Sequence, residues 1–231
     1  MRTHFPGIAA LLAIVSGIGV LPHVLAAQAV TVDEGSFTVT RNGEDIGREQ
    51  FRIIQRQSRG NSVYLATATS AYSDRRLAPA LETDSTGAPL RYQVEVHVDG
   101  DLSERLSGLI NRGRFSARSQ TPRGESAREY IVADGALILD EDVFHQYYFL
   151  HGRTGDVAVV VPRRNVQTTM RVESMGTESL AIGGETISAE HMVLTETGAG
   201  VRDIWLDAEG RVLRVAIPSR GIIATRDDPP G

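Results

Sequence analysis

The sequence predicts an all-β protein: a curved antiparallel sheet or open β-barrel with one short helix. Most segments after residue 29 alternate apolar and polar side chains with a period of two, which is typical of strands that bury one face of a sheet. Short turn sequences rich in Gly, Asn and Asp separate these segments at a spacing of about 8–12 residues, which is typical of sandwiches and barrels. One segment has the period of a helix instead.

Residues 1–29 have the three parts of a secretory signal peptide. A short polar start with Arg2 precedes an almost entirely apolar run over residues 8–25, and a cluster of small residues follows that run. We expect cleavage after Ala26 or Ala29, because both positions fit the small-residue rule for signal cleavage.

The alternative to cleavage is an uncleaved membrane anchor. A spanning helix needs roughly 20 apolar residues, and Gly17, Gly19, Pro22 and His23 interrupt the run here. We therefore expect a periplasmic or extracellular protein whose single β-rich domain covers residues 30–231. The chain contains no cysteine, so we expect no lipid anchor of the usual bacterial kind.

The alternation is clearest from Leu90 to Asp99, where the apolar positions face one side and the polar positions the other. Asn42-Gly43 and Asp99-Gly100 are typical of tight hairpin turns, because these residues adopt positive φ at low cost. Similar alternation predicts strands near residues 35–41, 46–56, 62–72, 102–109, 114–120, 125–132, 166–175, 185–196, 201–207, 211–217 and 221–226.

The helical segment covers residues 140–152. Asp140 or Asp142 is suited to cap its start, and Gly152 is suited to end it. We expect this amphipathic helix to pack on the sheet or to plug one mouth of it. Its predicted apolar face consists of Val143, Phe144, Tyr147, Tyr148 and His151.

The composition excludes several kinds of chemistry. Without cysteine there is no disulfide, no thiol nucleophile and no thiolate metal ligand. All 24 basic residues are arginine, so lysine chemistry is excluded too, and the net charge of −5 argues against general nucleic-acid binding. Six arginines between residues 105 and 128 could meet an anionic surface, but a solvated sheet face with cross-strand ion pairs is the favoured interpretation.

The sequence predicts no catalytic residues, no metal site and no cofactor. His145 and His151 are six residues apart, so they do not share a helix face as paired zinc ligands would. His191 lies on an apolar strand face, which favours a core histidine. The enzymatic alternative is a hydrolase or isomerase that uses His191, and pairing with Asp203 inside a pocket would support it.

The C-terminal third carries a connected pattern. A strand from Glu185 to Leu194 precedes Asp203-Ile204-Trp205-Leu206-Asp207, and a turn at Gly210 leads into a further strand. This pattern, over residues 185–226, resembles exported bacterial families of unknown function that end in a Trp-Leu-x-x-x-Gly hairpin. Those families in turn resemble the half-barrels of the lipoprotein-carrier group, LolA and LolB. The resemblance implies an open, curved sheet around an apolar cavity, with a helix against it.

We therefore expect a non-enzymatic protein that binds an apolar or amphipathic, lipid-like molecule in a sheet cavity, and that is membrane-peripheral at most. A structural or assembly protein of the envelope with a filled core is the other alternative. Trp205 shares its strand face with two acids, so we expect it half-buried at the cavity rim with its N–H bonded. The predicted ligand-binding residues are Phe144, Tyr147, Tyr148 and Trp205.

Overall fold

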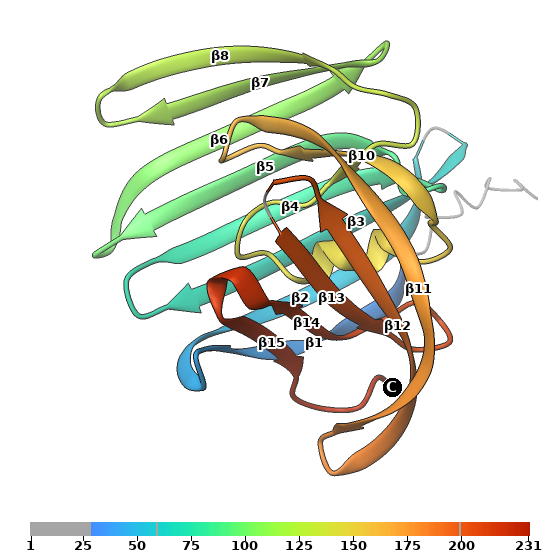
Figure 1. The fold of residues 1–231 in the computed structure, drawn as a ribbon. Coiled ribbons are helices and arrows are strands. Elements are labelled where there is room, and N and C mark those ends of the chain that lie inside the picture. Colours follow the sequence, from blue (N-terminus) through green and yellow to red (C-terminus); the bar gives the residue numbers. More distant parts are fainter. Residues whose placement is uncertain (1–28, 59, 199) are drawn as a thin grey trace, which may run out of the picture.

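The computed structural model describes residues 29–58, 60–198 and 200–231, which form one sheet of fifteen strands (Figure 1). Residues 1–28 of the predicted signal peptide lie outside the described residues. Two short 3-10 helices, η1 (His145–Leu150) and η2 (Pro218–Arg220), complete the fold. The strands are β1 (Val30–Arg41), β2 (Glu44–Ser58), β3 (Asn61–Tyr72), β4 (Arg76–Asp84), β5 (Pro89–Val98), β6 (Asp101–Asn111), β7 (Arg114–Thr121), β8 (Gly124–Ile131), β9 (Leu137–Ile138), β10 (Gly155–Val161), β11 (Val166–Ile182), β12 (Glu185–Glu196), β13 (Gly200–Leu206), β14 (Val212–Ile217) and β15 (Ile222–Arg226).

The all-β fold class is confirmed, and its topology is simple. Consecutive strands pair as antiparallel neighbours from β1 to β8 and from β10 to β15. β1 also pairs with β15, so the first and last strands join the two halves of the sheet. The short β9 pairs in parallel with β10, and the sheet's two edges, β8 and β9, therefore both come from the middle of the chain.

The sheet is rolled (Figure 1), and its β9 edge contacts β5. β10 is covered on both faces as a result. Val159 and Val160 point to opposite faces of the strand and are both fully buried. This overlap makes the molecule barrel-like although the sheet has two free edges.

The predicted hairpin turns are present. Asn42-Gly43 has φ values of 51° and 86°, and Asp99-Gly100 has φ values of 52° and 89°. Two successive positive φ values are what a tight two-residue hairpin turn needs. These turns thus fix the hairpins β1–β2 and β5–β6.

The concave side of the sheet is largely filled. Residues 139–150, which we call the buried turn, connect β9 towards β10 and carry η1 into the interior. Phe144, Tyr147 and Leu150 are each at most 2% exposed, and they join the main core beside residues such as Phe37 and Tyr92. The buried turn is therefore part of the core rather than a lid outside it.

The short helix is confirmed, but its predicted extent and caps are wrong. Only His145–Leu150 is helical, and it is a 3-10 helix that begins after Phe144 without a side-chain cap. Asp142 has a positive φ of 58°, outside helical geometry. The two predicted capping aspartates bind arginines instead, as described below.

Three strands were not predicted from the sequence: β4, β9 and β10.

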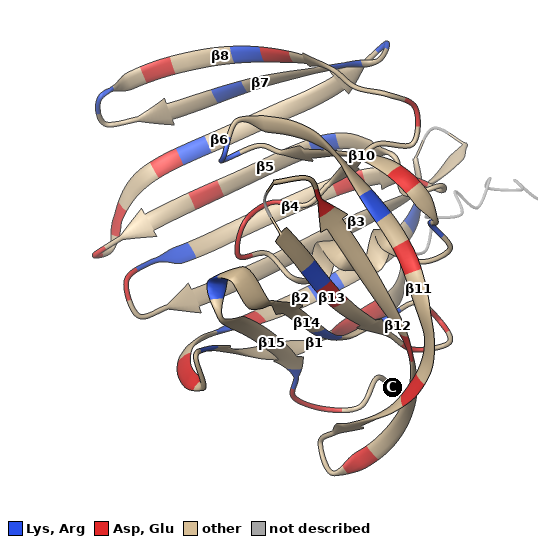
Figure 2. Cartoon of the chain, in the orientation of Figure 1, with Lys and Arg blue, Asp and Glu red and all other residues tan. Residues whose placement is uncertain are grey.

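The arginine-rich region over β6–β8 is a solvated face with ion pairs between neighbouring strands. Figure 2 shows both signs of charge along it. Examples are Arg114–Glu129 at 2.6 Å and Arg118–Glu125 at 3.0 Å.

None of the helices in the described part of the chain has the length and apolar character that crossing a membrane requires.

Candidate functional site

A buried carboxylate fixes the start of η1. Glu49 on β2 is fully buried and accepts hydrogen bonds from the backbone N–H groups of Phe144, at 3.1 Å, and His145, at 2.8 Å. The Ser70 hydroxyl donates to the same carboxylate at 2.9 Å, and Nδ1 of His145 lies 3.0 Å from it. A negative charge at this position stabilises the N–H groups that a helix start leaves unpaired.

Asp140 fixes the beginning of the buried turn. Its carboxylate accepts hydrogen bonds from the Tyr92 hydroxyl at 2.7 Å and from Nε of Arg163 at 3.0 Å. Burial, together with the charge of Asp140, raises the pKa of Tyr92 well above its ordinary value, so the phenol stays protonated and donates. The backbone N–H of Asp140 donates to Oε1 of Gln146 at 2.7 Å, which closes the turn on itself.

Asp142 binds two arginines from distant parts of the chain. Its carboxylate lies 2.5 Å from Nη2 of Arg75 and 2.7 Å from Nη2 of Arg220. The Tyr72 hydroxyl donates to the backbone carbonyl of Asp142 at 2.9 Å. Because these partners come from β3, the β3–β4 loop and η2, Asp142 holds both halves of the sheet to the buried turn.

A cavity of about 290 Å³ opens beside the buried turn, between it, β13 and η2. Part of its wall is apolar and part is charged. Phe144 and Tyr147, two of the four predicted ligand-binding residues, line it. The apolar wall consists of Leu139, Val143, Phe144, Tyr147, Val201 and Ile217, and the polar wall of Asp140, Glu141, Asp142, Arg164, Glu196, Arg202, Ser219 and Arg220.

Arg202 connects the two kinds of wall. Its Nη1 donates to the Tyr147 hydroxyl at 2.9 Å, and its Nη2 lies 3.4 Å from Oε2 of Glu196. The side chains of Arg202 and Glu196 are 14% and 8% exposed. Because the contact between Arg202 and Glu196 is long, the guanidinium and the carboxylate both keep hydrogen-bonding capacity next to the cavity.

Arg164 is held less tightly. Among the residues that the structure describes, its side chain forms ion pairs at 3.7 Å with Glu141 and at 3.9 Å with Glu196. Arg220 likewise reaches Glu141 at 3.9 Å. Separations of this length are ion pairs without hydrogen bonds, so the guanidinium donors of Arg164 remain available to a further group.

Tyr148 and Trp205 lie outside this cavity. Tyr148 is partly buried and packs against Tyr64 and Phe149, with ring centroids 6.2 and 5.4 Å away. Burial raises the pKa of Tyr148 to about 12. The buried turn therefore divides the predicted aromatic wall into two faces, of which only the one with Phe144 and Tyr147 reaches the cavity.

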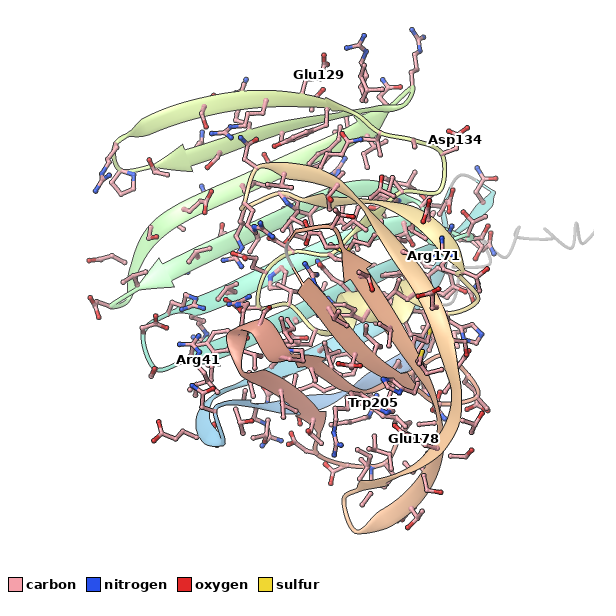
Figure 3. All side chains as sticks on the ribbon, in the orientation of Figure 1. Arg41, Glu129, Asp134, Arg171, Glu178 and Trp205 are labelled. Carbon is pink, nitrogen blue, oxygen red and sulfur yellow. The ribbon has the colours of Figure 1, made fainter. Side chains whose placement is uncertain are left out.

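Trp205 lies on the opposite face of β13 from Ile204 and Leu206, which belong to the main core. Its indole N–H donates to Glu178 of β11, and Figure 3 labels both residues. Trp205 is partly buried against a separate small apolar cluster that includes Leu213. The structure thus places Trp205 away from the cavity rim on which the sequence predicted it.

His191 does pair with Asp203: Nε2 lies 2.9 Å from Oδ1. The imidazole also stacks on Trp205, with the ring centroids 4.6 Å apart and the planes 8° from parallel. Neither His191 nor Asp203 lines the cavity beside the buried turn. The pair is therefore not part of the site beside the buried turn.

The charged residues of the cavity did not emerge from the sequence. Arg164 follows a strand without alternation, and Glu196 and Arg202 flank an ordinary Gly-containing turn. What these three residues share is a position at or near the end of a strand. The rolled sheet brings these strand ends to the same place. Among the residues that the structure describes, no group of three or more His, Asp or Glu side chains is arranged to hold a metal ion.

No protein-family model matches this sequence, and no curated protein is significantly similar to it. The structure is similar to the crystal structure of a β-barrel-like protein of a domain of unknown function, DUF1849, from Brucella abortus. The TM-score is 0.53 at 9% sequence identity, and the match covers 88% of this chain and 98% of the other. At this identity the similarity supports a β-barrel-like fold, and the resemblance to lipoprotein carriers stays a prediction.

Proposed function

We propose that this chain is a non-enzymatic binding protein that holds one end of an apolar or amphipathic, lipid-like molecule in the cavity beside the buried turn. The observation that carries the proposal is the cavity's wall. Phe144, Tyr147 and Ile217 offer apolar surface, while Arg164 and Arg202 offer donors that the protein uses incompletely. The lining combines apolar and charged side chains in similar measure, as an amphipathic ligand requires, and polar groups placed in a pocket fix a ligand's orientation.

The size of the cavity limits the ligand. The cavity has a volume of about 290 Å³. Ligand pockets generally start at about 300 Å³. The proposal is therefore a small amphiphile, or the end of a longer molecule whose remainder stays outside, rather than a whole lipid enclosed in the sheet.

The test is a calorimetric titration of residues 30–231 with a short single-chain amphiphile such as octanoate or octanol. Val201→Trp should abolish binding, because Val201 lines the cavity and is 38% exposed, so a larger ring narrows the mouth at little cost to the core. Leu109→Trp, on the outer face of β6 at 49% exposure, is the matched control and should bind as wild type does. Absence of binding by wild type, or full binding by Val201→Trp, would refute the proposal.

We propose further that the protein works in the periplasm or outside the cell after removal of residues 1–29. The support is the charged start, apolar run and small-residue cluster of the N-terminal sequence. N-terminal sequencing of protein purified from its own cells should give a start between Ala27 and Val30. An intact Met1 on a protein that only detergent extracts would contradict this.

A structural or assembly role is the second candidate, and one observation favours it. The buried turn fills most of the concave side, with Phe144 and Leu150 almost completely buried. A protein that only scaffolds other components needs such a filled interior and no ligand. Native mass spectrometry of the protein from its own envelope separates the two candidates: a co-purified small molecule favours binding, and a bare chain favours the structural role.

A further inference from the structure

We infer that the polar end of the ligand is an anion, a carboxylate or a phosphate, and that Arg164 and Arg202 bind it. This inference rests on the proposed function, because it assigns the chemistry of the same cavity. It is carried by the geometry of these two guanidiniums, whose donors the protein uses incompletely.

Unused donors, rather than net charge, favour an anion. Five guanidiniums face five carboxylates, so the charges of this cluster balance. The carboxylates are those of Asp74, Asp140, Glu141, Asp142 and Glu196, and the guanidiniums are those of Arg75, Arg163, Arg164, Arg202 and Arg220. Arg75, Arg163 and Arg220 form hydrogen-bonded ion pairs of 2.5–3.0 Å, whereas the ion pairs of Arg164 include no hydrogen bond. An anion can accept hydrogen bonds from the donors that remain, and a cation cannot.

Arg164 is the guanidinium best placed to exchange partners. Its two ion pairs, with Glu141 and Glu196, are 3.7 and 3.9 Å long and include no hydrogen bond. Its side chain is 36% exposed, so it can turn towards the cavity mouth without leaving the core empty. A guanidinium presents two parallel N–H groups to a carboxylate or phosphate, and this bidentate pair is stronger than the long ion pairs that it would replace.

Arg202 supplies the second donor group. It is more buried than Arg164, and the Tyr147 hydroxyl keeps its guanidinium in place at 2.9 Å. Both arginines approach Glu196, so they approach each other at one end of the cavity. Phe144, Val143 and Ile217 form the apolar wall of the same cavity. A cavity that has both an apolar wall and two guanidiniums suits a molecule with an alkyl end and an anionic head.

Four probes with the same eight-carbon chain test this inference: octanoate, octyl phosphate, neutral octanol and cationic octyltrimethylammonium. Octanoate or octyl phosphate should bind at least tenfold more tightly than octanol, and octyltrimethylammonium more weakly than octanol. The tighter of the two anions tells a carboxylate source, such as a free fatty acid, from a phosphate source, such as a lipid headgroup. The anion preference should decline with added salt, since salt screens charge attraction.

Two variants of Arg164 test whether this residue produces the anion preference. Arg164→Gln should remove most of the anion preference, measured as the ratio of anion to octanol affinity, whereas Arg164→Lys should restore part of it. Arg105→Gln, which removes an exposed arginine on β6, is the control and should leave this ratio unchanged.

The outcomes separate the two proposals. If none of the eight-carbon probes binds wild type, the proposed function fails. If octanol or octyltrimethylammonium binds as tightly as the anions, the proposed function stands and the anion inference is overturned. An unchanged anion preference in Arg164→Gln overturns the assignment of this residue.

Discussion

Among single residues, Tyr147 links the packing of the core to the cavity. Its ring is 2% exposed, and its hydroxyl accepts the hydrogen bond from Arg202. Tyr147→Ala should lower the free energy of unfolding by about 3–5 kcal/mol, as large-to-small core changes do. Tyr147→Phe should cost only about 1–2 kcal/mol, because it removes one hydrogen bond to a buried charged group and keeps the ring.

Tyr148 is the control for Tyr147, because it is the next residue but only partly buried. Tyr148→Ala should lower the free energy of unfolding by about 1–2 kcal/mol, in the ordinary range for point mutants. Urea unfolding of the three variants measures these differences. Equal losses for Tyr147→Ala and Tyr148→Ala would show that the buried turn packs differently from the structure described above.

Among the elements, η1 depends on the carboxylate of Glu49. Glu49→Gln keeps the shape of the side chain but replaces one acceptor oxygen with an amide that donates. At either oxygen's position that amide would face the N–H of Phe144, which already donates to both oxygens. We expect a loss of about 1.5–3 kcal/mol in the free energy of unfolding, the usual worth of a hydrogen bond to a charged group.

Hydrogen exchange locates the effect of Glu49→Gln. The amides of Phe144 and His145 should exchange faster in the variant than in wild type, because the acceptor loses its negative charge and one of its two oxygens. Glu44→Gln, an exposed position near the start of the same strand, is the control and should change stability by less than about 0.5 kcal/mol. Wild-type protection of both amides in Glu49→Gln would disprove the role of this carboxylate.

Most of the strands that the sequence predicted bury one face, although the exposed β8 was predicted too. β5 shows why burial of one face is predictable: its buried and exposed residues alternate, and this alternation is visible without a structure. β10 was not predicted, because the rolled sheet buries both of its faces and its valines therefore do not alternate with polar residues. β4 was not predicted either, since Pro79 and two alanines weaken its pattern.

The candidate site was predictable only where its residues are neighbours in sequence. Phe144 and Tyr147 belong to one aromatic segment, so spacing alone pointed to them. Arg202 and Arg164 reach the same cavity only because the sheet rolls, and no local pattern reports that. The wrong helix caps have the same cause, because the arginines that bind Asp142 lie far away in the sequence.

For the whole molecule, the joint between β1 and β15 matters most, because it hydrogen-bonds the two halves of the sheet. A fully buried ion pair crosses it: Arg226 contacts Asp33 at 2.8 and 3.1 Å, and both side chains are 2% exposed. The guanidinium also donates to the backbone carbonyl of Glu34 at 2.7 Å. Gly35 leaves room for this pair, since a Cβ at this position would lie 3.0 Å from Nη2 of Arg226 and would push the guanidinium by a few tenths of an ångström.

Arg226→Met should lower the free energy of unfolding by about 3–5 kcal/mol at neutral pH, because it leaves the carboxylate of Asp33 buried without a partner. The exposed pair Arg105–Glu95 is the control, and Arg105→Gln should cost at most about 1 kcal/mol. The double variant Asp33→Leu/Arg226→Met should be much closer to wild type than Arg226→Met, since no charge then remains buried.

The loss in the free energy of unfolding that Arg226→Met causes should also depend on pH. Burial raises the pKa of Asp33 above its ordinary value of 3.8, although Arg226 opposes that shift. For a carboxyl whose folded pKa is raised, burial costs little while the group is neutral, and stability falls as the pH rises through the folded pKa. Removing Arg226 raises this pKa further. The variant should therefore lose more stability than wild type as the pH rises. Urea unfolding at neutral pH and near pH 3.8 measures this, and an equal loss at both pH values would mean that Asp33 is not the group left unpaired.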